Sequence, residues 1–298
     1  MPVTLSTKLL HTLQKGKARL GAEALRRIAR FVESQRTAEH AFRNKSGKAD
    51  LYYTAFGWTL SRLLGIGIDP QKMHRYLSQQ QPEQLDLVHY AAYIRCRMLR
   101  QWIKNGKAGL FVQSLLPFKI RALDTFTAVP HADLHAPYTQ FLWHSLREDA
   151  GRRTPNTPDT LADYHVPGGG YRNTRDGLTA TTNATVAALA LRGPSAGYRA
   201  NEDLHYLRNL QDTSGGFRAA PAAPFPDLLS TATALFVLDC YHTPSNYPAQ
   251  HFIESHWLDS GGFSATLPED HSDVEYTFYG LLALGASAQE FRKKQLGR

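Results

Sequence analysis

The sequence is poor in cysteine and in long apolar runs, and both shortages exclude classes of protein. Its two cysteines, Cys96 and Cys240, are too few and too isolated for a disulfide framework, which favours a reducing compartment. No segment approaches the roughly 18 apolar residues that a membrane-spanning helix requires. Residues 1–21 are too polar, and too often interrupted by lysine, for the apolar core of a signal peptide. The sequence therefore predicts a cytoplasmic protein.

Recognisable nucleic-acid-binding motifs are also missing, although the chain is basic, with a formal net charge of +8 at pH 7. The positive charge is concentrated in one segment, 95–107, and Lys119 and Arg121 follow it. Such a segment attracts phosphate groups or an anionic membrane, and it is equally typical of a solvated helix face. Because no binding motif accompanies the charge, we expect no nucleic-acid partner and leave peripheral membrane contact open. The cations of the segment are Arg95, Arg97, Arg100, Lys104 and Lys107.

A repeated pattern occupies the last third of the chain. Gly-Gly-Phe at 215–217 precedes Asp227, and Gly-Gly-Phe at 261–263 precedes Asp273; in both copies the phenylalanine stands ten residues before the aspartate. An apolar stretch follows each aspartate, and the two copies are roughly 46 residues apart. A fixed period of this length is typical of repeated supersecondary units.

Each repeat unit is predicted to be a helix, a glycine turn, an aspartate and a second helix. In the unit at 201–240, Asn201 is the predicted N-cap of the first helix. The two glycines end that helix, since glycine adopts the left-handed conformation at little steric cost. Asp227 then caps a second helix over 228–239, which is apolar nearly all round and is therefore expected to be buried.

Earlier parts of the chain contain weaker copies of the same unit. A first helix over 25–35 leads to Asp50, and the segment from Asp50 resembles the segment from Asp273, including a threonine four residues after the aspartate. Another copy covers 71–99 with Asp86 in the cap position, and a further one has Gly-Gly-Tyr at 169–171 before a helix over 179–191. This makes five units with room for a sixth, and residues 105–136 are the hardest to place.

These units predict an all-α protein, a single domain over 1–298 in the form of an α/α toroid. In this double ring of six helical hairpins, polar helices lie outside and apolar helices inside, because a hairpin buries its apolar face only against its neighbours. An open solenoid is the alternative, and the continuous apolarity of the inner helices favours closure. We expect an N-terminal basic arm or helix at 1–21, repeat units over 22–286 and a C-terminal helix at 287–298. The inner helices would line a central cavity with the aspartates near one mouth.

The repeat resembles that of the prenyltransferase β-subunit and squalene/terpene cyclase superfamily. The likeness rests on Leu-x-x-Leu-Gln with Gly-Gly-Phe at 207–217, Gly-Gly-Phe with Asp-x-x-Tyr-Thr at 261–277, and Asp-Leu-Tyr-Tyr-Thr at 50–54, and it covers roughly 22–100 and 160–286. It implies an α/α barrel whose cavity holds an isoprenoid chain against aromatic walls. By analogy with heterodimeric prenyltransferases, it also allows a helical partner subunit.

The catalytic motifs of that superfamily are missing. The resemblance places its zinc ligands at Asp227, Leu229 and Tyr276, and leucine cannot coordinate a metal. Neither the Asp-x-Asp-Asp motif of the cyclases nor an Asp-Asp-x-x-Asp run for magnesium and diphosphate occurs. We therefore predict no metal ligands and no cofactor; zinc is disfavoured and magnesium is left open.

Acidic residues near the predicted mouth are the candidate catalytic groups. Neighbouring carboxylates raise one another's pKa, so that one of them could stay protonated and act as a general acid. The alternative is that these residues only occupy helix N-termini, where acidic side chains are favoured. The candidates are Asp227, Asp273 and Glu275.

Aromatic and basic side chains are the candidate binding groups. Aromatic faces attract carbocations, although aromatics on a buried helix also serve simply as core. Arginines hold phosphate with two parallel hydrogen bonds, and a surface turn explains the same residues equally well. We expect Tyr53, Phe56, Trp58, Tyr276 and Tyr279 to line an apolar pocket, and Arg172, Arg175 and Arg218 to hold a diphosphate.

The predicted function is the binding of an isoprenoid, with or without its diphosphate, in the central cavity. If the protein is an enzyme, we expect prenyl transfer or cyclisation with non-standard catalytic residues. Two alternatives remain open: a non-catalytic binding or scaffold protein on the same fold, and a glycan-processing enzyme, since other α/α barrels place paired carboxylates at a mouth. Fold alone does not decide among them.

Overall fold

The part of the chain that the structure describes is all-α, as predicted. The computed structural model describes residues 4–104, 133–152, 160–194 and 200–287. In this part of the chain the strands β1 (Phe42–Arg43) and β2 (Ala49–Asp50) form a two-stranded antiparallel sheet, and the remaining elements are helices. The inner helices are α3 (Leu51–Leu64), α5 (Leu87–Lys104), α7 (Pro137–Asp149), α8 (Thr182–Arg192), α10 (Leu228–Cys240) and α12 (Val274–Ala286).

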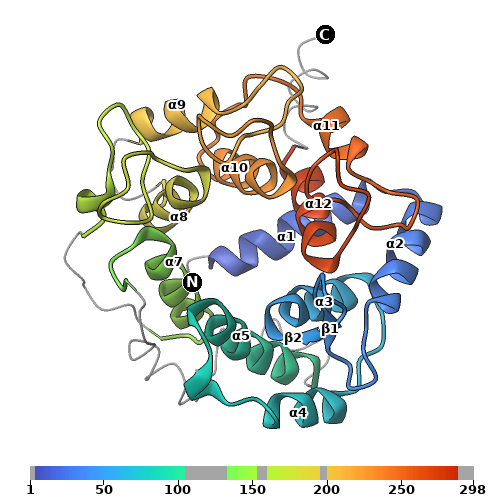
Figure 1. The fold of residues 1–298 in the computed structure, drawn as a ribbon. Coiled ribbons are helices and arrows are strands. Elements are labelled where there is room, and N and C mark those ends of the chain that lie inside the picture. The colour runs from blue at the N-terminus through green and yellow to red at the C-terminus, as the bar shows by residue number, and fades with distance from the viewer. Residues whose placement is uncertain (1–3, 105–132, 153–159, 195–199, 288–298) are drawn as a thin grey trace.

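The six inner helices stand side by side around a common axis (Figure 1). Each contacts the next one along the chain, and α12 contacts α3, so that the series of contacts is closed. Outside them lie α2 (Ala22–Ser34), α4 (Pro70–Ser78), α9 (Asn201–Asn209) and α11 (Gln250–Ser255), each in contact with an inner helix. The short helices η1 (Pro82–Gln84) and η5 (Thr160–Tyr164) precede α5 and α8.

Aspartates begin four of the inner helices, as predicted. Each carboxylate accepts a hydrogen bond of 2.8–2.9 Å from a backbone N–H two or three residues later, which satisfies a donor that the helix leaves without a partner. These residues are Asp50, Asp86, Asp227 and Asp273. The predicted cap at Asn201 is wrong: Ala200 precedes α9 and makes no side-chain capping bond, and Asn201 is the first residue of the helix, so the helix begins one residue earlier than expected.

In four units a buried threonine, four residues after the N-cap of the inner helix, holds the aromatic residue of the turn; the N-caps concerned are Asp50, Thr181, Asp227 and Asp273. The backbone N–H of the aromatic residue donates to the threonine hydroxyl at 2.8–3.3 Å, and all four threonines are fully buried. The threonine shared by the segments at 50–57 and 273–280 therefore has a structural role that recurs in two further units. The pairs are Phe42 with Thr54, Tyr171 with Thr185, Phe217 with Thr231, and Phe263 with Thr277.

Replacing Thr231 by valine is expected to lower the free energy of unfolding by about 1–3 kcal/mol, because the buried N–H of Phe217 loses its acceptor while the side-chain shape is kept. Among the described residues, the hydroxyl of Thr233 on the same helix bonds only to carbonyl oxygens of that helix. Thr233→Val is therefore the matched control, and its free energy of unfolding should fall much less. Urea unfolding measures both. If both variants lost the same free energy of unfolding, the hydrogen bond from Phe217 to Thr231 would contribute nothing specific to stability.

The glycine turns pack against the outer helix of the next unit. Gly215 and Gly261 have φ angles of 91° and 96°, and a Cβ at Gly215 would lie 2.2 Å from the carbonyl oxygen of Pro248, just before α11. A Cβ at Gly261 would lie 2.6 Å from the carbonyl oxygen of Arg27 in α2. The turn of the last unit thus contacts the first outer helix, which closes the outer layer at this point as well.

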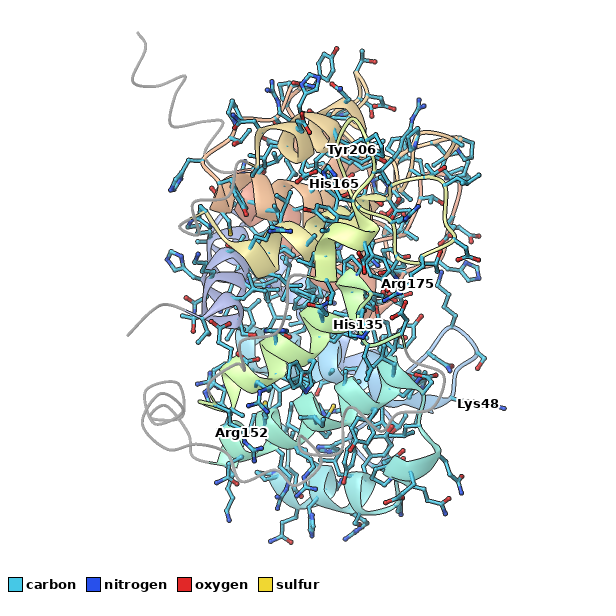
Figure 2. The ribbon with its side chains drawn as sticks, turned by 90° about the vertical axis from the view of Figure 1, so that its left-hand side faces the viewer. Lys48, His135, Arg152, His165, Arg175 and Tyr206 are labelled. Carbon is cyan, nitrogen blue, oxygen red and sulfur yellow. The ribbon has the colours of Figure 1, made fainter. Side chains whose placement is uncertain are left out.

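The N-terminal segment is the helix α1 (Leu5–Ala18), one of the two forms predicted for it. It lies across one end of the ring and contacts α12 and α7 (Figure 1). The side view in Figure 2 shows it on the opposite side from Lys48 and Arg175, whose loops lie near the N-termini of the inner helices. We call the end with these N-termini the mouth and the end crossed by α1 the floor.

Some expectations fall on residues that the structure does not describe. The predicted C-terminal helix at 287–298 lies outside the described residues except for Ser287, and most of the segment at 105–136 does too. Among the described helices, none combines the length and the apolarity needed to span a membrane.

Candidate functional site

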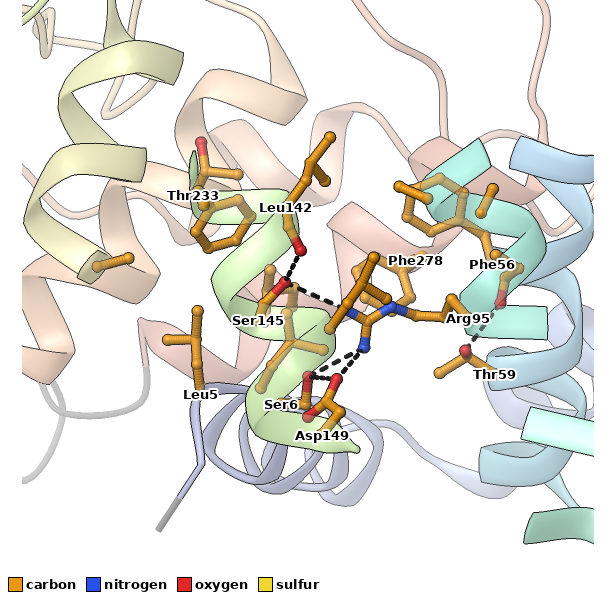
Figure 3. Close-up of a pocket in the computed structure, with 18 of the residues that line it drawn as sticks. Leu5, Ser6, Phe56, Thr59, Arg95, Leu142, Ser145, Asp149, Thr233 and Phe278 are labelled. Atoms are coloured by element: carbon orange, nitrogen blue, oxygen red, sulfur yellow. Dashed lines mark hydrogen bonds and ion pairs between the residues drawn. The ribbon is translucent and has the colours of Figure 1, made fainter. Parts of the chain in front are cut away.

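A cavity of about 260 Å³ lies inside the ring (Figure 3). Its described walls come from all six inner helices, and α1 contributes Leu5, Leu9 and Leu10 from the floor. Small-molecule pockets are typically about 300–1,000 Å³ and largely apolar, so this cavity lies just below that range and suits a small ligand. The central cavity is therefore the candidate binding site.

Aromatic side chains form one wall of the cavity. Phe56 of α3 is the centre of the group: its ring centroid lies 4.9 Å from that of Tyr52, 5.0 Å from Phe278 and 5.7 Å from Tyr279. These rings meet edge-to-face or tilted, and Tyr138 of α7 lines the cavity as well. Of the five aromatic residues expected in the pocket, Phe56 and Tyr279 lie in its lining.

Trp58 faces away from the cavity, so its predicted place in the pocket is wrong. Its side chain is fully buried, its Nε1 donates to the carbonyl oxygen of His40 at 2.6 Å, and its ring packs against Tyr76 of α4. The reason is helical geometry: Trp58 comes two residues after Phe56, and its side chain therefore points about 200° further round the helix. Trp58 belongs to the layer between inner and outer helices.

Tyr53 and Tyr276 lie near the mouth and not in the cavity lining. The pKa of both phenols is raised, mainly by burial and then by nearby carboxylates that include Glu275 and Asp273. The ammonium of Lys45 stands 5.3 Å from the centroid of the Tyr276 ring. The two tyrosines therefore lie close to the acidic groups of the mouth.

Glu275 is a buried carboxyl next to the aromatic wall. Only 7% of the residue is exposed, and its Oε1 accepts a hydrogen bond of 2.7 Å from the hydroxyl of Tyr52, which itself lines the cavity. Burial raises the pKa of Glu275 to about 7; the Tyr52 hydrogen bond opposes this rise, and the charge of Asp273 adds to it. Close to neutral pH the carboxyl is thus present in both protonation states, as a general acid must be.

Asp273 and Asp227 are capping residues near the same mouth. Burial raises the pKa of both carboxyls, and hydrogen bonds from the capped backbone lower it in part. Asp227 also accepts a hydrogen bond of 2.7 Å from the hydroxyl of Ser230. None of the three candidate carboxyls lines the cavity, but Glu275 is bonded to Tyr52, which does. The geometry therefore assigns the two aspartates to helix capping and makes Glu275 the candidate that is linked to the cavity.

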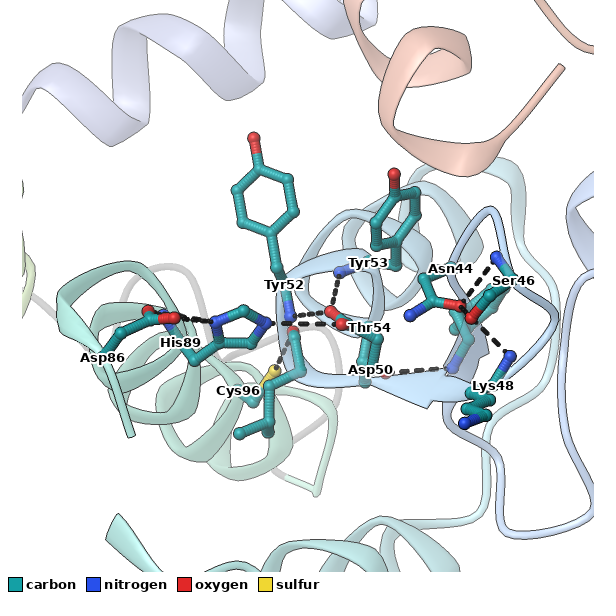
Figure 4. Close-up of polar contacts among 12 residues, drawn as sticks. Asn44, Ser46, Lys48, Asp50, Tyr52, Tyr53, Thr54, Asp86, His89 and Cys96 are labelled. Carbon is teal, nitrogen blue, oxygen red and sulfur yellow. Dashed lines mark hydrogen bonds and ion pairs between the residues drawn. The ribbon is translucent and has the colours of Figure 1, made fainter. Parts of the chain in front are cut away.

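His89 joins two caps at the mouth (Figure 4), and sequence reasoning missed it. Its Nδ1 lies 2.9 Å from the carboxylate of Asp86 and its Nε2 lies 3.3 Å from that of Asp50. The hydrogen bond with Asp50, followed by that with Asp86, raises the pKa of His89 to about 9, against the effect of burial. The histidine is therefore charged at neutral pH and holds the starts of α3 and α5 together. The signal in the sequence was the spacing, because a histidine three residues after a capping aspartate lies within reach of its carboxylate.

The three arginines expected to hold a diphosphate already have partners within the protein. The guanidinium of Arg172 donates to two backbone carbonyls, at 2.9 and 3.0 Å. That of Arg175 lies 3.8 Å from the carboxylate of Asp163, and that of Arg218 lies 4.0 Å from Asp212. None of the three lines the cavity. The contacts found here are those of loop-stabilising residues.

The basic segment at 95–107 does not present one solvated face. Arg97 is exposed and lies 5.7 Å from the ring centroid of Tyr93, whereas Arg100 donates to the carbonyl oxygen of Pro70 at 3.0 Å. Arg95 points into the cavity (Figure 3). Lys107 lies outside the described residues.

Arg95 is the centre of a polar cluster at the floor. Its Nη1 donates to Asp149 at 2.6 Å and to the Ser6 hydroxyl at 3.0 Å, and its Nη2 donates to the Ser145 hydroxyl at 3.4 Å (Figure 3). We call these four residues the floor cluster. The sequence did contain a signal for this cluster. At helical spacing Arg95 falls on the same face of α5 as the apolar residues Val88, Ala91, Ala92 and Leu99.

In the described part of the chain, no group of three or more His, Cys, Asp or Glu side chains is arranged to hold a metal ion. The resemblance assigns a cysteine ligand to the position of Leu229, and a leucine side chain cannot bind a metal ion. Magnesium therefore stays an untested expectation.

Comparison with known proteins gives no match, either among protein-family models or among curated proteins. The likeness to the prenyltransferase and cyclase superfamily thus rests on the repeat motifs.

Proposed function

We propose that the chain is an α/α toroid of the prenyltransferase and cyclase type that binds an unsaturated, isoprenoid-like chain in its central cavity. In this proposal Glu275 is a general acid that starts an isomerisation or cyclisation. The observation that carries it is the buried carboxyl of Glu275, with a pKa of about 7, bonded to a tyrosine that lines an aromatic cavity. The closed series of helix contacts and the four equivalent turns support the toroid.

The proposed reaction begins with the neutral carboxyl of Glu275. Its proton passes to one carbon of a double bond, directly or through the hydroxyl of Tyr52, and the electron pair of that double bond forms the new C–H bond. The neighbouring carbon becomes a carbocation, which a second double bond of the ligand can attack. Loss of a proton to the Glu275 carboxylate restores the acid, so that the product is an isomer of the substrate and no co-reactant is consumed.

The surroundings of Glu275 fit both halves of this cycle. The hydroxyl of Tyr52 donates to Oε1 and thereby stabilises the carboxylate that forms when the proton leaves. The rings of Phe56, Phe278 and Tyr279 lie on the cavity side, where aromatic faces stabilise a cation by about 1–2 kcal/mol each. Because the three loop arginines already have partners, the proposal does not depend on a diphosphate.

The test is turnover in wild type against Glu275→Gln, which keeps the size of the side chain and removes the transferable proton. Purified protein is incubated with geraniol, farnesol, farnesene and farnesyl diphosphate, and products are identified by gas chromatography and mass spectrometry. We expect an isomer of at least one of these compounds from wild type. Glu275→Gln should bind that compound with unchanged affinity and lose turnover by about 10²–10⁴-fold.

The control is Glu254→Gln on the outer helix α11, which should behave as wild type. Equal turnover in wild type and Glu275→Gln would refute the acid role of Glu275. Binding without turnover in both would favour the alternative of a non-catalytic binding protein, and no binding at all would refute the ligand class.

A further inference from the structure

We propose that the ligand of the central cavity carries a hydroxyl group at the end that reaches the floor, and that Arg95, Ser145 and Asp149 recognise it. This inference rests on one part of the proposed function, the binding of an apolar chain in the cavity, and does not depend on the chemistry of Glu275. It defines the ligand as a chain with one polar end.

The first observation is a charged pair at the end of a largely apolar cavity. Arg95 and Asp149 both line the cavity and form an ion pair of 2.6 Å. The Asp149 side chain is 11% exposed, whereas that of Arg95 keeps 32% of its surface accessible. Part of the Arg95 side chain is therefore open to whatever occupies the cavity.

The two terminal nitrogens of Arg95 have different surroundings. Nη1 has short bonds to Asp149 and Ser6, which tie α5 to α7 and to the start of α1, and this accounts for a structural role. Nη2 has only the bond of 3.4 Å to Ser145, close to the limit for a hydrogen bond, and no other described residue takes a hydrogen bond from it. Since each terminal nitrogen carries two N–H groups, Nη2 has donor capacity left for a ligand.

Ser145 complements this donor. Its hydroxyl donates to the carbonyl oxygen of Leu142 at 2.9 Å, so towards the cavity it acts as an acceptor. The Asp149 carboxylate is a second acceptor in the same cluster. The floor cluster therefore offers one donor and two acceptors within a small space.

A hydroxyl is the end group that suits this arrangement. It accepts a hydrogen bond from Nη2 and donates one to Ser145 or Asp149. A carboxylate has no proton to donate and meets the negative charge of Asp149. A hydrocarbon end removes water from Arg95 without replacing its hydrogen bonds, which is unfavourable for a charged group.

The position of the floor cluster is compatible with the acid at the mouth. Arg95 is eight residues into α5, which corresponds to about 12 Å of helix below the mouth. Glu275 lies in the first turn of α12, at the mouth itself. A chain anchored by its hydroxyl at the floor therefore extends its double bonds along the aromatic wall towards Glu275.

The test compares three ligands with the same carbon skeleton: farnesol, the hydrocarbon farnesene and the farnesoate anion. Their affinities are measured by titration calorimetry or by quenching of tryptophan fluorescence. We expect wild type to bind farnesol on the order of ten- to a hundredfold more tightly than farnesene, and farnesoate more weakly than farnesol.

Two variants assign the preference to the floor cluster. Arg95→Lys keeps a positive charge for Asp149 but has a single nitrogen, so it should lose the preference for farnesol and keep the affinity for farnesene. Ser145→Ala leaves the ion pair intact and should weaken farnesol binding selectively. Arg97→Lys, on the exposed side of the same helix, is the matched control, and urea unfolding checks that each variant is folded.

Each result decides the proposal. Equal affinity of wild type for farnesol and farnesene would overturn it and leave the proposed function standing. A farnesol preference that survives in both Arg95→Lys and Ser145→Ala would also overturn it, since the hydroxyl would then be bound elsewhere. Failure to bind any of the three ligands would instead refute the ligand class of the proposed function.

Discussion

Glu275→Gln is expected to be more stable than wild type at pH 8, by up to about 3 kcal/mol. Burial raises the pKa of Glu275 from its ordinary value of 4.5 to about 7, which means that the folded protein favours the neutral carboxyl. The stability that comes from the neutral form is fully present below pH 4.5 and is lost as pH rises through 7, because the unfolded chain releases the proton earlier. Glutamine stays neutral throughout and still accepts the hydrogen bond from Tyr52.

Urea unfolding of both proteins between pH 4.5 and pH 8 measures this effect. The difference in the free energy of unfolding should grow with pH and level off above about pH 8. Glu254→Gln, at an exposed position of α11, should show no such trend and is the control. A difference that does not change with pH would mean that Glu275 titrates as an ordinary carboxyl, and the general-acid proposal would lose its basis.

Local signals explain why the repeat units could be predicted from the sequence. The helix expected at 228–239 is α10, which ends one residue later, and the capping role of Asp227 is as predicted. A capping aspartate and an apolar run act over a few residues, so the sequence carries them directly. The role of Thr231 was beyond such reasoning, because its partner Phe217 lies 14 residues earlier and reaches it only through the fold of the turn.

The cavity lining was harder to predict, because it depends on the rotation of each inner helix about its own axis. Phe56 and Trp58 are both aromatic and nearly adjacent, yet one faces the cavity and the other faces α4. By composition Arg95 belongs to a basic segment, which suggests a solvent-exposed side chain. By its place on the helix it belongs to the apolar stripe of α5, and like that stripe it faces the cavity. Because Arg95 stands among other cations in the sequence, the floor cluster was not predicted.

The floor itself had only an indirect signal in the sequence. Nothing in the apolar and basic pattern of 1–21 indicates that this helix crosses the end of the ring. Two glycines allow the crossing: a Cβ at Gly16 would lie 2.0 Å from the carbonyl oxygen of Leu281, and one at Gly285 would lie 1.9 Å from that of Thr12. Backbone thus meets backbone between α1 and α12, and this contact is visible only when both helices are placed.

Gly285→Val is expected to lower the free energy of unfolding by about 3 kcal/mol or more, or to displace α1 from the floor. The obstacle to any Cβ at this position is the backbone of Thr12, which cannot rotate away as a flexible side chain would. Since α1 supplies Leu5, Leu9 and Leu10 to the cavity, its displacement would open the floor to water. Ligand affinity should then fall together with stability.

Three measurements detect the displacement of α1 in Gly285→Val: urea unfolding, tryptic cleavage within α1 and ligand titration. Displacement predicts rapid cleavage at Lys8 and Lys15 while the ring of inner helices stays folded. Gly67→Ala is the matched control, because no atom lies within 4 Å of a Cβ at that position and its φ is not in the left-handed region, so its stability should stay within about 0.5 kcal/mol of wild type. If Gly285→Val kept full stability and a protected α1, the close crossing of α1 and α12 would be wrong. The floor of the cavity, and with it the recognition of a ligand end by Arg95, would have to be placed anew.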